Sequence, residues 1–434
     1  MTQQADPGTD PGEPGRRARR VATSRADRRP RVAGKRKAPQ PGRTVTKVIG
    51  ASLLALAMAT AVGVVLLYNN WNGNIRVEAI DHQLQDRPDK QVVGPQEPLN
   101  ILVMGSDSRA CEGCGVDNEA GGGLSDTTIL FHLSANRKFA YGISIPRDTA
   151  VMRPTCFKKD GEEIAGSSGY EKWNAAFAVG GPACTVQQFE QLTGVRLDNY
   201  VVVDFGQFKD MVNALDGVEV CIPEDINDEV RNIYLKAGTR EIKGDEALTY
   251  MRARYRIGDG TDTNRTRRQQ AFIGSMINKV LTAGMLTRPD RLIGFMNAAT
   301  SSLQTDFKNI ARIADLAATA QGIGPSNIKF VTTPWGGTDK VSGGVEWTPE
   351  VEQLWRLVIG DKPLTPMFLK DAISAADNPD GSPSAPTSAP PSGTGSATPS
   401  DSASETAGDP TDAATDPADQ GLSDDGRAAA GLCT

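Results

Sequence analysis

Apolar side chains divide the chain into regions of very different character. Residues 1–47 contain Pro, Gly and Arg but almost no large apolar side chains. Such a segment cannot bury enough surface to offset the entropy of ordering, so we predict a disordered arm. Residues 48–68 then read VIGASLLALAMATAVGVVLLY without a charged residue. At ~1.5 Å per residue this run spans ~30 Å, the hydrocarbon thickness of a bilayer, and predicts a transmembrane helix.

Strand-like and helix-like patterns alternate from residue 98 to residue 370. Runs rich in Val, Ile, Phe and Thr predict strands, namely LNILVMGS, TTILFHLS, FAYGISI, VVVDF, GVEVCI and IKFVTTP. Amphipathic runs predict helices, namely KWNAAFAV, CTVQQFEQLTG, GQFKDMVNALDG, GDEALTYMRARY, RRQQAFIGSMINKVL, ARIADLAATA and EVEQLWRLVIG. This alternation predicts one α/β domain, a three-layer α/β/α sandwich around a central mixed sheet.

Two segments flank this domain. Residues 69–97 are largely polar, and we interpret them as an extracytoplasmic linker. From residue 371 to residue 434 the composition turns to Ser, Thr, Pro, Ala, Gly and Asp without periodicity. We predict that this tail is disordered, because it lacks the apolar pattern of a core.

The distribution of charge sets the orientation that we expect in a membrane. The formal net charge of −6 averages a basic N-terminal arm with an acidic tail that has Arg427 as its single basic residue. Basic residues 16–47 precede the apolar run, and the positive-inside rule then leaves the N-terminus in the cytoplasm. A cleaved signal peptide is the alternative, but the apolar run and its basic arm are longer than such signals usually have. We therefore place the domain outside the cell membrane.

An extracytoplasmic location allows the six cysteines to form disulfides. Cys111 and Cys114 form a C-x-x-C in a Gly-rich loop, which fits a redox pair, half a metal site or a small structural disulfide. A zinc site is disfavoured because the chain has no second C-x-x-C and no histidine partner nearby.

The other four cysteines lie in different contexts. Cys156 follows a strand-like segment and Cys184 precedes a helix-like one, and we expect a disulfide between them. Cys221 lies in the apolar run GVEVCIP, where we expect it to pack as a small buried hydrophobe. Cys433 lies in the tail, either free or cross-linked.

Candidate chemistry gathers at the ends of predicted strands. With two histidines in the chain, we find neither a Ser/His/Asp nor a Cys/His arrangement. Asp107 and Arg109 instead follow the first strand, Asp126 precedes the second, and Arg147 and Asp148 follow the third. Loops at the carboxyl ends of strands in open α/β sheets meet at a ligand crevice.

These residue types suit a phosphorylated ligand and a divalent cation. Asp107 and Asp126 carry the hard oxygen donors that Mg²⁺ or Mn²⁺ prefers, and magnesium often uses one or two carboxylates together with phosphate oxygens. Arginine adds a planar fork that pairs bidentately with phosphate and stays charged. The sequence therefore predicts a metal-assisted phosphate site.

A second group of arginines surrounds a predicted break between two helices. Arg252, Arg254 and Arg256 cannot share one helical face, so we expect the helix to end there, with Gly258 and Gly260 forming the break. A second basic cluster, Arg265, Arg267 and Arg268, leads with Gln269 into the next helix. The N-terminal dipole of that helix also attracts anions. We expect Arg267 to face solvent. The alternative is that these arginines form surface salt bridges with Asp259 and Asp262.

The order of these motifs resembles the LytR-CpsA-Psr family of envelope proteins. The pieces that carry the resemblance are LNILVMGSDSR, SDTTIL, ISIPRDT, KWNAAFAVGGP, TGVRLDNYVVVDFGQF, GVEVCIP, ALTYMRARY and TDTNRTRRQQ, within residues 99–281. The resemblance implies a phosphotransferase that moves a glycopolymer from a polyprenyl-pyrophosphate carrier onto peptidoglycan through a phosphodiester. It also leaves room for a pyrophosphatase side activity.

The resemblance further implies roles for individual residues. The pyrophosphate-binding and catalytic positions fall on Asp107, Arg109, Asp126, Arg147, Lys172, Arg252, Arg254, Arg265 and Gln269, with Asp262 in the same motif. Many relatives have an arginine where this chain has Leu124. That departure weakens the expected phosphate site, shifts its work to another arginine or marks a family member of reduced activity.

The expected reaction needs charge neutralisation and in-line positioning more than a protein nucleophile. A peptidoglycan hydroxyl would attack the glycan-proximal phosphorus, with Asp148 or Asp126 taking its proton. The lipid would lie in an apolar groove near Phe177, Phe205 and Phe208, although such aromatics are more often core.

Two other functions compete with the transferase interpretation. A non-catalytic module that binds envelope polymer or lipid pyrophosphate is the stronger alternative, favoured by Leu124. A transcriptional attenuator would use the basic arm on DNA, but the arm shows no helix-turn-helix pattern and would lie beside the membrane lipids. We expect no nucleic-acid partner, and the sequence leaves the oligomeric state open.

Overall fold

The computed structural model describes residues 41–90, 96–106, 124–231, 233–282, 288–301, 303–382 and 421–434. The chain forms two compact units, residues 1–62 and 63–434, which are described separately. The expected disordered arm lies mostly outside the described residues, and its last seven residues, 41–47, are helical instead.

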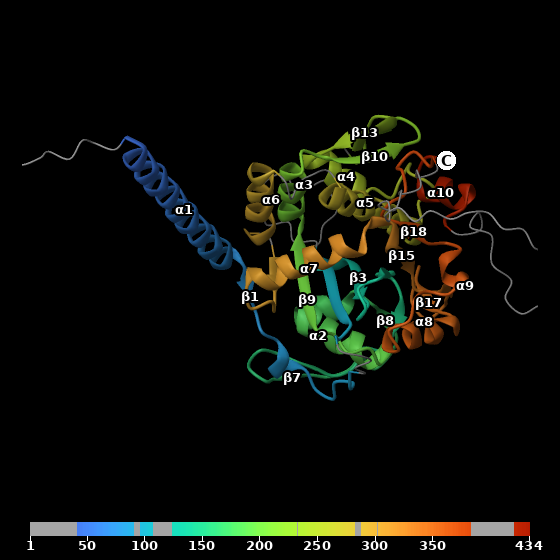
Figure 1. The fold of residues 1–434 in the computed structure, drawn as a ribbon. Coiled ribbons are helices and arrows are strands. Elements are labelled where there is room, and N and C mark those ends of the chain that lie inside the picture. The colour runs from blue at the N-terminus through green and yellow to red at the C-terminus, as the bar shows by residue number, and fades with distance from the viewer. Residues whose placement is uncertain are drawn as a thin grey trace, which may run out of the picture. The chain divides into compact units, whose positions relative to one another are not determined.

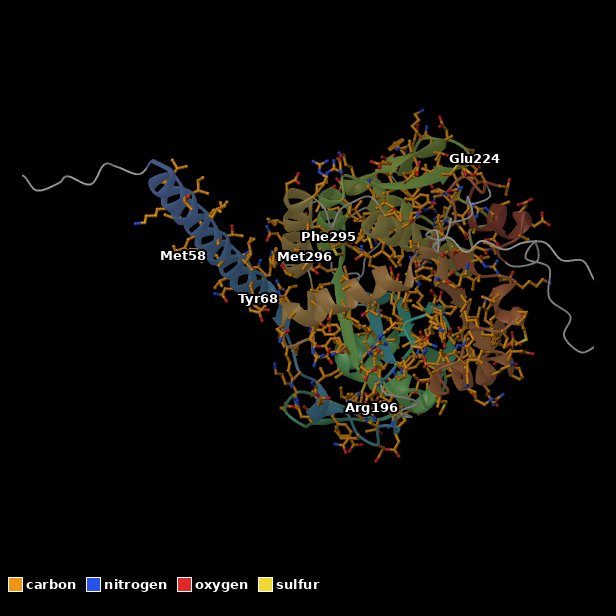
Figure 2. The ribbon with its side chains drawn as sticks, viewed as in Figure 1. Met58, Tyr68, Arg196, Glu224, Phe295 and Met296 are labelled. Carbon is orange, nitrogen blue, oxygen red and sulfur yellow. A yellow bond between two sulfur atoms is a disulfide. The ribbon has the colours of Figure 1, made fainter. Side chains whose placement is uncertain are left out.

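Helix α1 (Pro41–Asn74) begins in the first unit and ends in the second. Its segment Val45–Asn74 is long and apolar enough to cross a membrane, and it contains the span expected at residues 48–68. Figure 2 shows Met58 and Tyr68 projecting outward from this helix, where both side chains are exposed. By length and composition, α1 is a candidate membrane span.

An eight-stranded sheet forms the centre of the second unit (Figure 1). Its spatial order is β1 (Arg76–Val77), β14 (Leu303–Thr305), β9 (Asn199–Asp204), β2 (Leu99–Ser106), β3 (Ser125–Leu133), β4 (Ala140–Ile145), β15 (Ile328–Thr332) and β18 (Ile373–Ser374). Strand β2 pairs parallel with β9 and antiparallel with β3, and β4 pairs parallel with β15. The expected central mixed sheet is confirmed.

Helices cover both faces of this sheet, as the alternation of inward-facing residues requires. On one face, Leu130 and Ile143 pack with Phe189 of α2 (Ala175–Thr193) and with α8 (Glu350–Ile359). On the other face, Phe330 packs with Ile273 of α5 (Asp262–Thr282) and with α7 (Ile310–Ile323). The three-layer α/β/α sandwich is therefore confirmed.

The remaining elements surround these layers. The further helices are η1 (Asp81–Gln83), α3 (Phe205–Ala214), α4 (Gly244–Arg252), α6 (Pro289–Ser301), η3 (Pro325–Asn327), α9 (Pro366–Leu369) and α10 (Asp424–Ala430). Five two-stranded ribbons add β5 (Ala150–Val151) with β8 (Glu171–Lys172), β6 (Cys156–Phe157) with β7 (Glu163–Ile164), β10 (Val218–Ile222) with β13 (Gly238–Ile242), β11 (Ile226–Asp228) with β12 (Ile233–Leu235), and β16 (Trp335–Gly337) with β17 (Val345–Trp347). These numbers of helices and strands refer to the residues that the structure describes.

Helix α2 differs from the sequence expectation in two ways. The two helices predicted there run together and kink at Gly180 and Gly181, the second of which has a φ of +63°. The first predicted helix was expected to begin at Lys172, but Lys172 pairs in the ribbon β5–β8. Gly194 ends α2 in the left-handed conformation that glycine adopts readily.

The segment expected to be a linker, residues 69–97, is part of the folded unit where it is described. Ile80 and Leu84 are buried in the main core, and β1 pairs with β14. Trp71 Nε1 also donates a hydrogen bond to Asn297 Oδ1 at 2.7 Å. These few apolar residues are too widely spaced to give a periodic signal, yet Ile80 and Leu84 join the core and β1 extends the sheet beyond β14.

The prediction of a disordered tail is wrong for both parts of the tail that the structure describes. Residues 371–382 include β18, and residues 421–434 include α10, with Ala430 and Leu432 buried. A disulfide joins Cys221 to Cys433, so the expectation that Cys221 is an unpaired hydrophobe is also wrong. Composition could not reveal this, because the cross-link spans 212 positions. Residues 383–420 lie outside the described part of the chain.

The other cysteine expectations have different outcomes. The disulfide expected between Cys156 and Cys184 is present, and both residues are buried in a small cluster with Ala176. It ties β6 to α2, next to the helix kink. Cys111 and Cys114 lie outside the described residues, so their pairing stays a prediction.

Candidate active site

Three carboxylates converge on Arg147, directly after β4. Its Nη1 forms a close ion pair with Asp126 Oδ1 on β3. Its Nε lies 3.4 Å from Asp262 Oδ1 at the start of α5 and 3.8 Å from Asp148 Oδ2. Adjacent antiparallel strands β3 and β4 bring Asp126 and Arg147 to the same edge of the sheet, as their positions at strand ends predicted.

Lys172 joins this group through Asp148. Its Nζ lies 2.8 Å from Asp148 Oδ1, and its side chain is 39% exposed. The ribbon β5–β8 holds it there, because Lys172 pairs with Ala150, two residues after Asp148. Lys172 is therefore a half-exposed cation at the margin of the cluster, free to reach a ligand from one side.

The second arginine group approaches the same cluster from the end of α4 and the start of α5. Helix α4 ends at Arg252, three residues before the predicted end at Tyr255, and Gly258 and Gly260 follow with φ values of +59° and +77°. Arg254 Nη2 lies 3.5 Å and Arg265 Nη2 lies 2.8 Å from Asp262 Oδ1. Asp262 thus joins Arg147, Arg254 and Arg265, which lie far apart in the sequence.

Arg252 and Gln269 complete the expected set that lies within the described residues. The Arg252 guanidinium carbon stands 4.4 Å from the centre of the Phe205 ring, and Arg252 is buried. Gln269 Nε2 donates to the carbonyl of Met251 at 3.1 Å, and its Oε1 accepts from Thr127 Oγ1 at 3.2 Å. Gln269 therefore ties the end of α4 to α5 and β3. Asp107 and Arg109 lie outside the described residues.

An apolar cavity of about 290 Å³ adjoins the charged cluster. It lies between the sheet and helices α3, α4 and α5, and residues of the cluster also line it, namely Asp126, Arg252, Arg265 and Gln269. Phe205 and Phe208 line this cavity, as expected for a lipid groove, whereas Phe177 packs in the core on the other face of the sheet. Phe177 is therefore a core residue, as such aromatics more often are, and does not line a lipid groove.

Burial gives the cluster an unusual electrostatic balance. Burial raises the pKa of Asp262, and Asp148 and Asp126 add to the rise, although Arg265 and Arg147 oppose it. Burial works to lower the pKa of Arg147, but Asp126, Asp262 and Asp148 raise it overall. Both Asp262 oxygens and the Nε atoms of Arg147 and Arg265 find no well-aligned hydrogen-bond partner among the described residues. Such buried groups are costly unless a ligand completes their hydrogen bonds.

Arg267 and Arg268 differ from their neighbour Arg265. Arg268 is fully buried and donates to the backbone carbonyls of Tyr250, Ala253 and Ala430, and burial lowers its pKa to about 10. It remains charged at neutral pH and holds the helix break together. Arg267 is half-buried and is the most exposed of the three arginines, so the expectation that it faces solvent holds only in part.

The donor chemistry of the cluster suits a hard cation only in part. Asp126 offers carboxylate oxygens, but it is paired with Arg147. Within the described segments, no group of three or more His, Cys, Asp or Glu residues forms a metal site. Magnesium commonly needs only one or two protein carboxylates, with water and phosphate supplying the rest. The fit therefore depends on Asp126 acting together with Asp107.

The raised pKa of Asp262 predicts a specific dependence of stability on pH. A carboxyl with a raised pKa in the folded state holds its proton there more tightly than in the unfolded chain. Folding stability therefore falls as the pH rises from the usual value of 3.8 through the raised value. We expect the Asp262→Asn variant to lack this loss, so its melting temperature relative to the wild type should increase over that pH range.

Asp225→Asn provides the opposite control. A backbone hydrogen bond from Ala237 and the ion pair with Lys236 lower the pKa of Asp225, so this exposed carboxylate stabilises the fold more as the pH rises. Its Asn variant should therefore lose melting temperature relative to the wild type as the pH increases. A constant difference between Asp262→Asn and the wild type at all pH values would contradict the assignment.

Comparison with known proteins adds the family. The LytR-CpsA-Psr family model matches residues 67–357. The chain belongs to the LytR-CpsA-Psr family. It is 32% identical over 231 residues to the probable cell wall biosynthesis protein LcpB of Corynebacterium glutamicum, covering 51% of this chain and 52% of that protein.

A second relative, from Bacillus subtilis, is similar to this chain in sequence and has a solved structure. The polyisoprenyl-teichoic acid–peptidoglycan teichoic acid transferase TagV is 30% identical over 264 residues, covering 59% of this chain and 62% of that protein. The crystal structure of TagV aligns with a TM-score of 0.47 and 27% identity, covering 62% of this chain and all of that one. The match thus spans less than two thirds of the length of LcpB and of TagV.

Sequence reasoning located most of the described cluster but misjudged its centre. Asp262 was noted as part of a motif and as a partner in surface salt bridges, whereas three arginines surround it in a largely buried position. Its position at the first turn of a helix that follows two glycines was the available signal. Asp148 was considered for proton transfer, whereas its contact with Lys172 had no sequence signal.

Proposed function

We propose that this protein is a membrane-anchored phosphotransferase that moves a glycopolymer from a polyprenyl-pyrophosphate carrier onto peptidoglycan. The observation that carries the proposal is the cavity of about 290 Å³ whose wall is apolar but includes Arg252 and Arg265. A polyprenyl chain needs an apolar enclosure, and its pyrophosphate needs guanidinium groups at one end of that enclosure. One cavity offers both.

Relatives support the reaction class through their names. LcpB is named a probable cell wall biosynthesis protein, and TagV is named a polyisoprenyl-teichoic acid–peptidoglycan teichoic acid transferase. The substrates named for TagV combine a long isoprenoid, a phosphorylated polymer and a glycan acceptor. The apolar cavity and the arginine cluster of this chain suit the first two of these chemical features.

The proposed reaction is a displacement at phosphorus. An acceptor hydroxyl of peptidoglycan forms a bond to the glycan-proximal phosphorus, the bond to the bridging oxygen breaks, and polyprenyl phosphate leaves. Arg147, Arg254 and Arg265 stabilise the charge on the phosphoryl oxygens, because guanidinium groups fixed in a buried site need no reorganisation. Asp126 and Asp148 both contact Arg147, where either can take the hydroxyl proton.

We also propose that Asp126 and Asp107 hold Mg²⁺ or Mn²⁺. When bound, the cation would neutralise charge on the pyrophosphate. In the described structure Asp126 pairs with Arg147, which orients the carboxylate at the edge of the sheet. Arg147 can then turn from the carboxylate to the phosphate when both ligands enter.

The proposed location follows from α1 and the basic arm. The arm should stay in the cytoplasm, with α1 crossing the membrane and the catalytic domain outside. The disulfides Cys156–Cys184 and Cys221–Cys433 agree with an oxidising extracytoplasmic environment. This placement gives the domain access to the lipid carrier and to peptidoglycan.

The deciding experiment is reconstitution of the full-length protein in vesicles that contain a lipid-linked glycopolymer. Peptidoglycan and Mg²⁺ are supplied, and the product is digested and analysed by mass spectrometry. The expected result is a new phosphodiester between polymer and peptidoglycan, with release of polyprenyl phosphate. Tight binding of the lipid-linked polymer without any linkage would instead favour a non-catalytic binding module.

Filling the apolar cavity should impair use of long carriers. Met276 of α5 lines the cavity, so Met276→Trp would occupy space that the lipid needs. We expect the KM for a long-chain polyprenyl-pyrophosphate donor to rise about tenfold, since a clash in an apolar pocket costs about 1–3 kcal/mol. Steady-state kinetics with long and short prenyl chains check this prediction.

The short-chain donor is the internal control for Met276→Trp. Its chain does not extend to the filled part of the cavity, so its KM should change much less than that of the long-chain donor. Equal losses with both donors, or no loss with either, would show that the lipid binds elsewhere. A melting curve of the variant establishes that the enlarged side chain leaves the domain folded.

A further inference from the structure

A second groove, of about 430 Å³, opens beside the arginine cluster. It lies at the carboxyl end of β15 and is distinct from the apolar cavity between α3, α4 and α5. The residues that matter for its chemistry are Arg267, Thr333, Trp335, Glu350, Met367 and Asp371. None of these six residues was among those that the sequence assigned to the phosphate site.

The backbone links this groove directly to Arg147. Strand β15 pairs parallel with β4, and Thr332 faces Ser144, three residues before Arg147. The ribbon β16–β17, which carries Trp335, is attached on the same side, because Val345 N donates to the carbonyl of Asp148 at 3.1 Å. The groove and the cluster therefore share one edge of the sheet.

Large apolar groups are exposed at the groove. Trp335 is 42% exposed and Met367 is 48% exposed, although both belong to a folded domain with apolar cores available. An indole ring that stays accessible offers a flat face with a polar N–H at its edge. Sugar rings present a matching C–H face and a rim of hydroxyl groups.

The polar groups of the groove suit hydroxyl groups better than phosphate. Glu350 and Asp371 supply two carboxylates, while Arg267 supplies one cation that already donates to Asn264 Oδ1 at 3.1 Å. These three side chains carry a formal charge of −1, opposite in sign to what a phosphate requires. Carboxylates and guanidinium groups together can accept from and donate to neutral hydroxyls.

Thr333 gives independent evidence that the groove binds a ligand with polar groups. Its side chain is fully buried at the groove, and its Oγ1 has no hydrogen-bond partner among the described residues. Its backbone N is satisfied by the carbonyl of Ser144 at 2.9 Å. A buried hydroxyl without a partner costs about 1–3 kcal/mol, and a ligand hydroxyl in the groove would remove that cost.

We propose that this groove binds sugar rings of the acceptor glycan and presents its hydroxyl to the phosphate held by Arg147. This assignment rests on the proposed transferase function. The donor then occupies the apolar cavity and the arginine cluster, and the acceptor approaches from the side of β15. Trp335 stacks against one sugar ring, while Thr333, Glu350 and Asp371 pair with hydroxyls.

The test replaces Trp335 in the full-length protein and measures the effects on the acceptor and on the donor separately. Trp335→Ala should raise the KM for soluble peptidoglycan glycan fragments about tenfold or more, as expected for loss of an aromatic anchor. Binding of a prenyl pyrophosphate and kcat at saturating acceptor should change little. Trp335→Phe, which keeps an aromatic face, should recover most of the affinity, and melting curves verify folding.

Tyr234→Ala is the matched control, because Tyr234 is also an exposed aromatic, 55% exposed, but lies on β12. It should leave the acceptor KM unchanged. An unchanged acceptor KM in Trp335→Ala would overturn the groove assignment while leaving the transferase proposal intact.

Direct titration distinguishes failure of the groove from failure of the proposed function. Glycan fragments are titrated into wild type, Trp335→Phe and Trp335→Ala by calorimetry, without any donor. Weakened binding in Trp335→Ala alone would support the groove even if the wild type formed no phosphodiester. Equal binding by all three proteins, or no binding by the wild type, would overturn it.

Discussion

Replacing Arg147 with Ala is expected to lower the rate of glycopolymer transfer by about 10²- to 10³-fold, the usual effect of removing one fixed donor that stabilises transition-state charge. The structural reason is the position of Arg147 within the cluster. It contacts Asp126, Asp148 and Asp262, and it is the side chain that links the strand ends to the start of α5. Single-turnover transfer with lipid-linked polymer and peptidoglycan measures the loss.

Two further variants separate catalysis from folding. Arg147→Lys keeps the charge but loses the planar fork, so we expect a loss smaller than that of Arg147→Ala but still about tenfold or more. Arg240→Ala is the matched control, since Arg240 also pairs with a carboxylate, Glu246, but stands on β13 outside the cluster. Full transfer activity in a folded Arg147→Ala protein would contradict the proposed role.

The cation expected at Asp126 gives Arg147→Ala a second measurable effect. Without the guanidinium, Asp126, Asp148 and Asp262 would lie close together with less compensating charge. A site with more negative charge attracts a divalent cation more strongly, and Asp126 would no longer be held by its ion pair with Arg147. The same substitution should therefore lower the Mg²⁺ concentration needed for half-maximal transfer, a shift that a purely structural defect would not produce.

The strands and most helices could be predicted because their signals are local. Runs such as TTILFHLS are buried on both faces of a central strand, and β3 is found there. The strand-end rule also located Asp126 and Arg147, since neighbouring strands must bring their ends together. The helix break after Arg252 followed equally from local residues, the two glycines at 258 and 260.

The features that escaped prediction depend on contacts between distant segments. Lys172 was expected to begin a helix, but pairing with Ala150 draws it into a strand. Phe177 was considered for the lipid groove, but the kinked α2 places it on the opposite face of the sheet from Phe205. Neither outcome follows from propensity, because tertiary pairing overrides the local preference.

The groove at β15 illustrates the same limit for function. Thr333 lies at the end of a predicted strand and Trp335 just beyond it, and their neighbours Met367 and Asp371 come from beyond α8. Their common location depends on β15 pairing with β4 and on the ribbon β16–β17 contacting Asp148. Sequence spacing alone could not show that these side chains share one edge of the sheet with Arg147.

The C-terminal segment braces the helix break that carries Arg254. The backbone N of Asp259 donates to the carbonyl of Ala429 at 2.9 Å, and Arg268 donates to that of Ala430 at 3.3 Å. A Cβ atom at Gly258 would lie 2.1 Å from the carbonyl oxygen of Ala429, so the two backbones are in close contact there. The disulfide Cys221–Cys433 fixes this segment to β10.

Breaking Cys221–Cys433 should therefore destabilise the domain and weaken catalysis together. The disulfide closes a loop of 212 positions, and we expect the Cys221→Ala/Cys433→Ala protein to lose about 2–4 kcal/mol, or roughly 5–15 °C in Tm. Release of the segment also frees the loop before Asp262. We therefore expect kcat to decrease even at temperatures below the melting temperature, where the variant is folded. Calorimetry and transfer assays of the same preparation measure both effects.

The other disulfide provides the comparison that makes this prediction specific. Cys156–Cys184 closes only 28 positions, so chain entropy makes its expected contribution roughly 2 kcal/mol smaller, and it contacts neither Arg254 nor Asp262. Cys156→Ala/Cys184→Ala should lower Tm less and leave kcat nearly unchanged at a temperature where the variant is folded. Equal losses of kcat in both variants would show that unfolding alone reduces activity, whereas a selective loss without Cys221–Cys433 would assign the C-terminal segment the role of positioning Arg254.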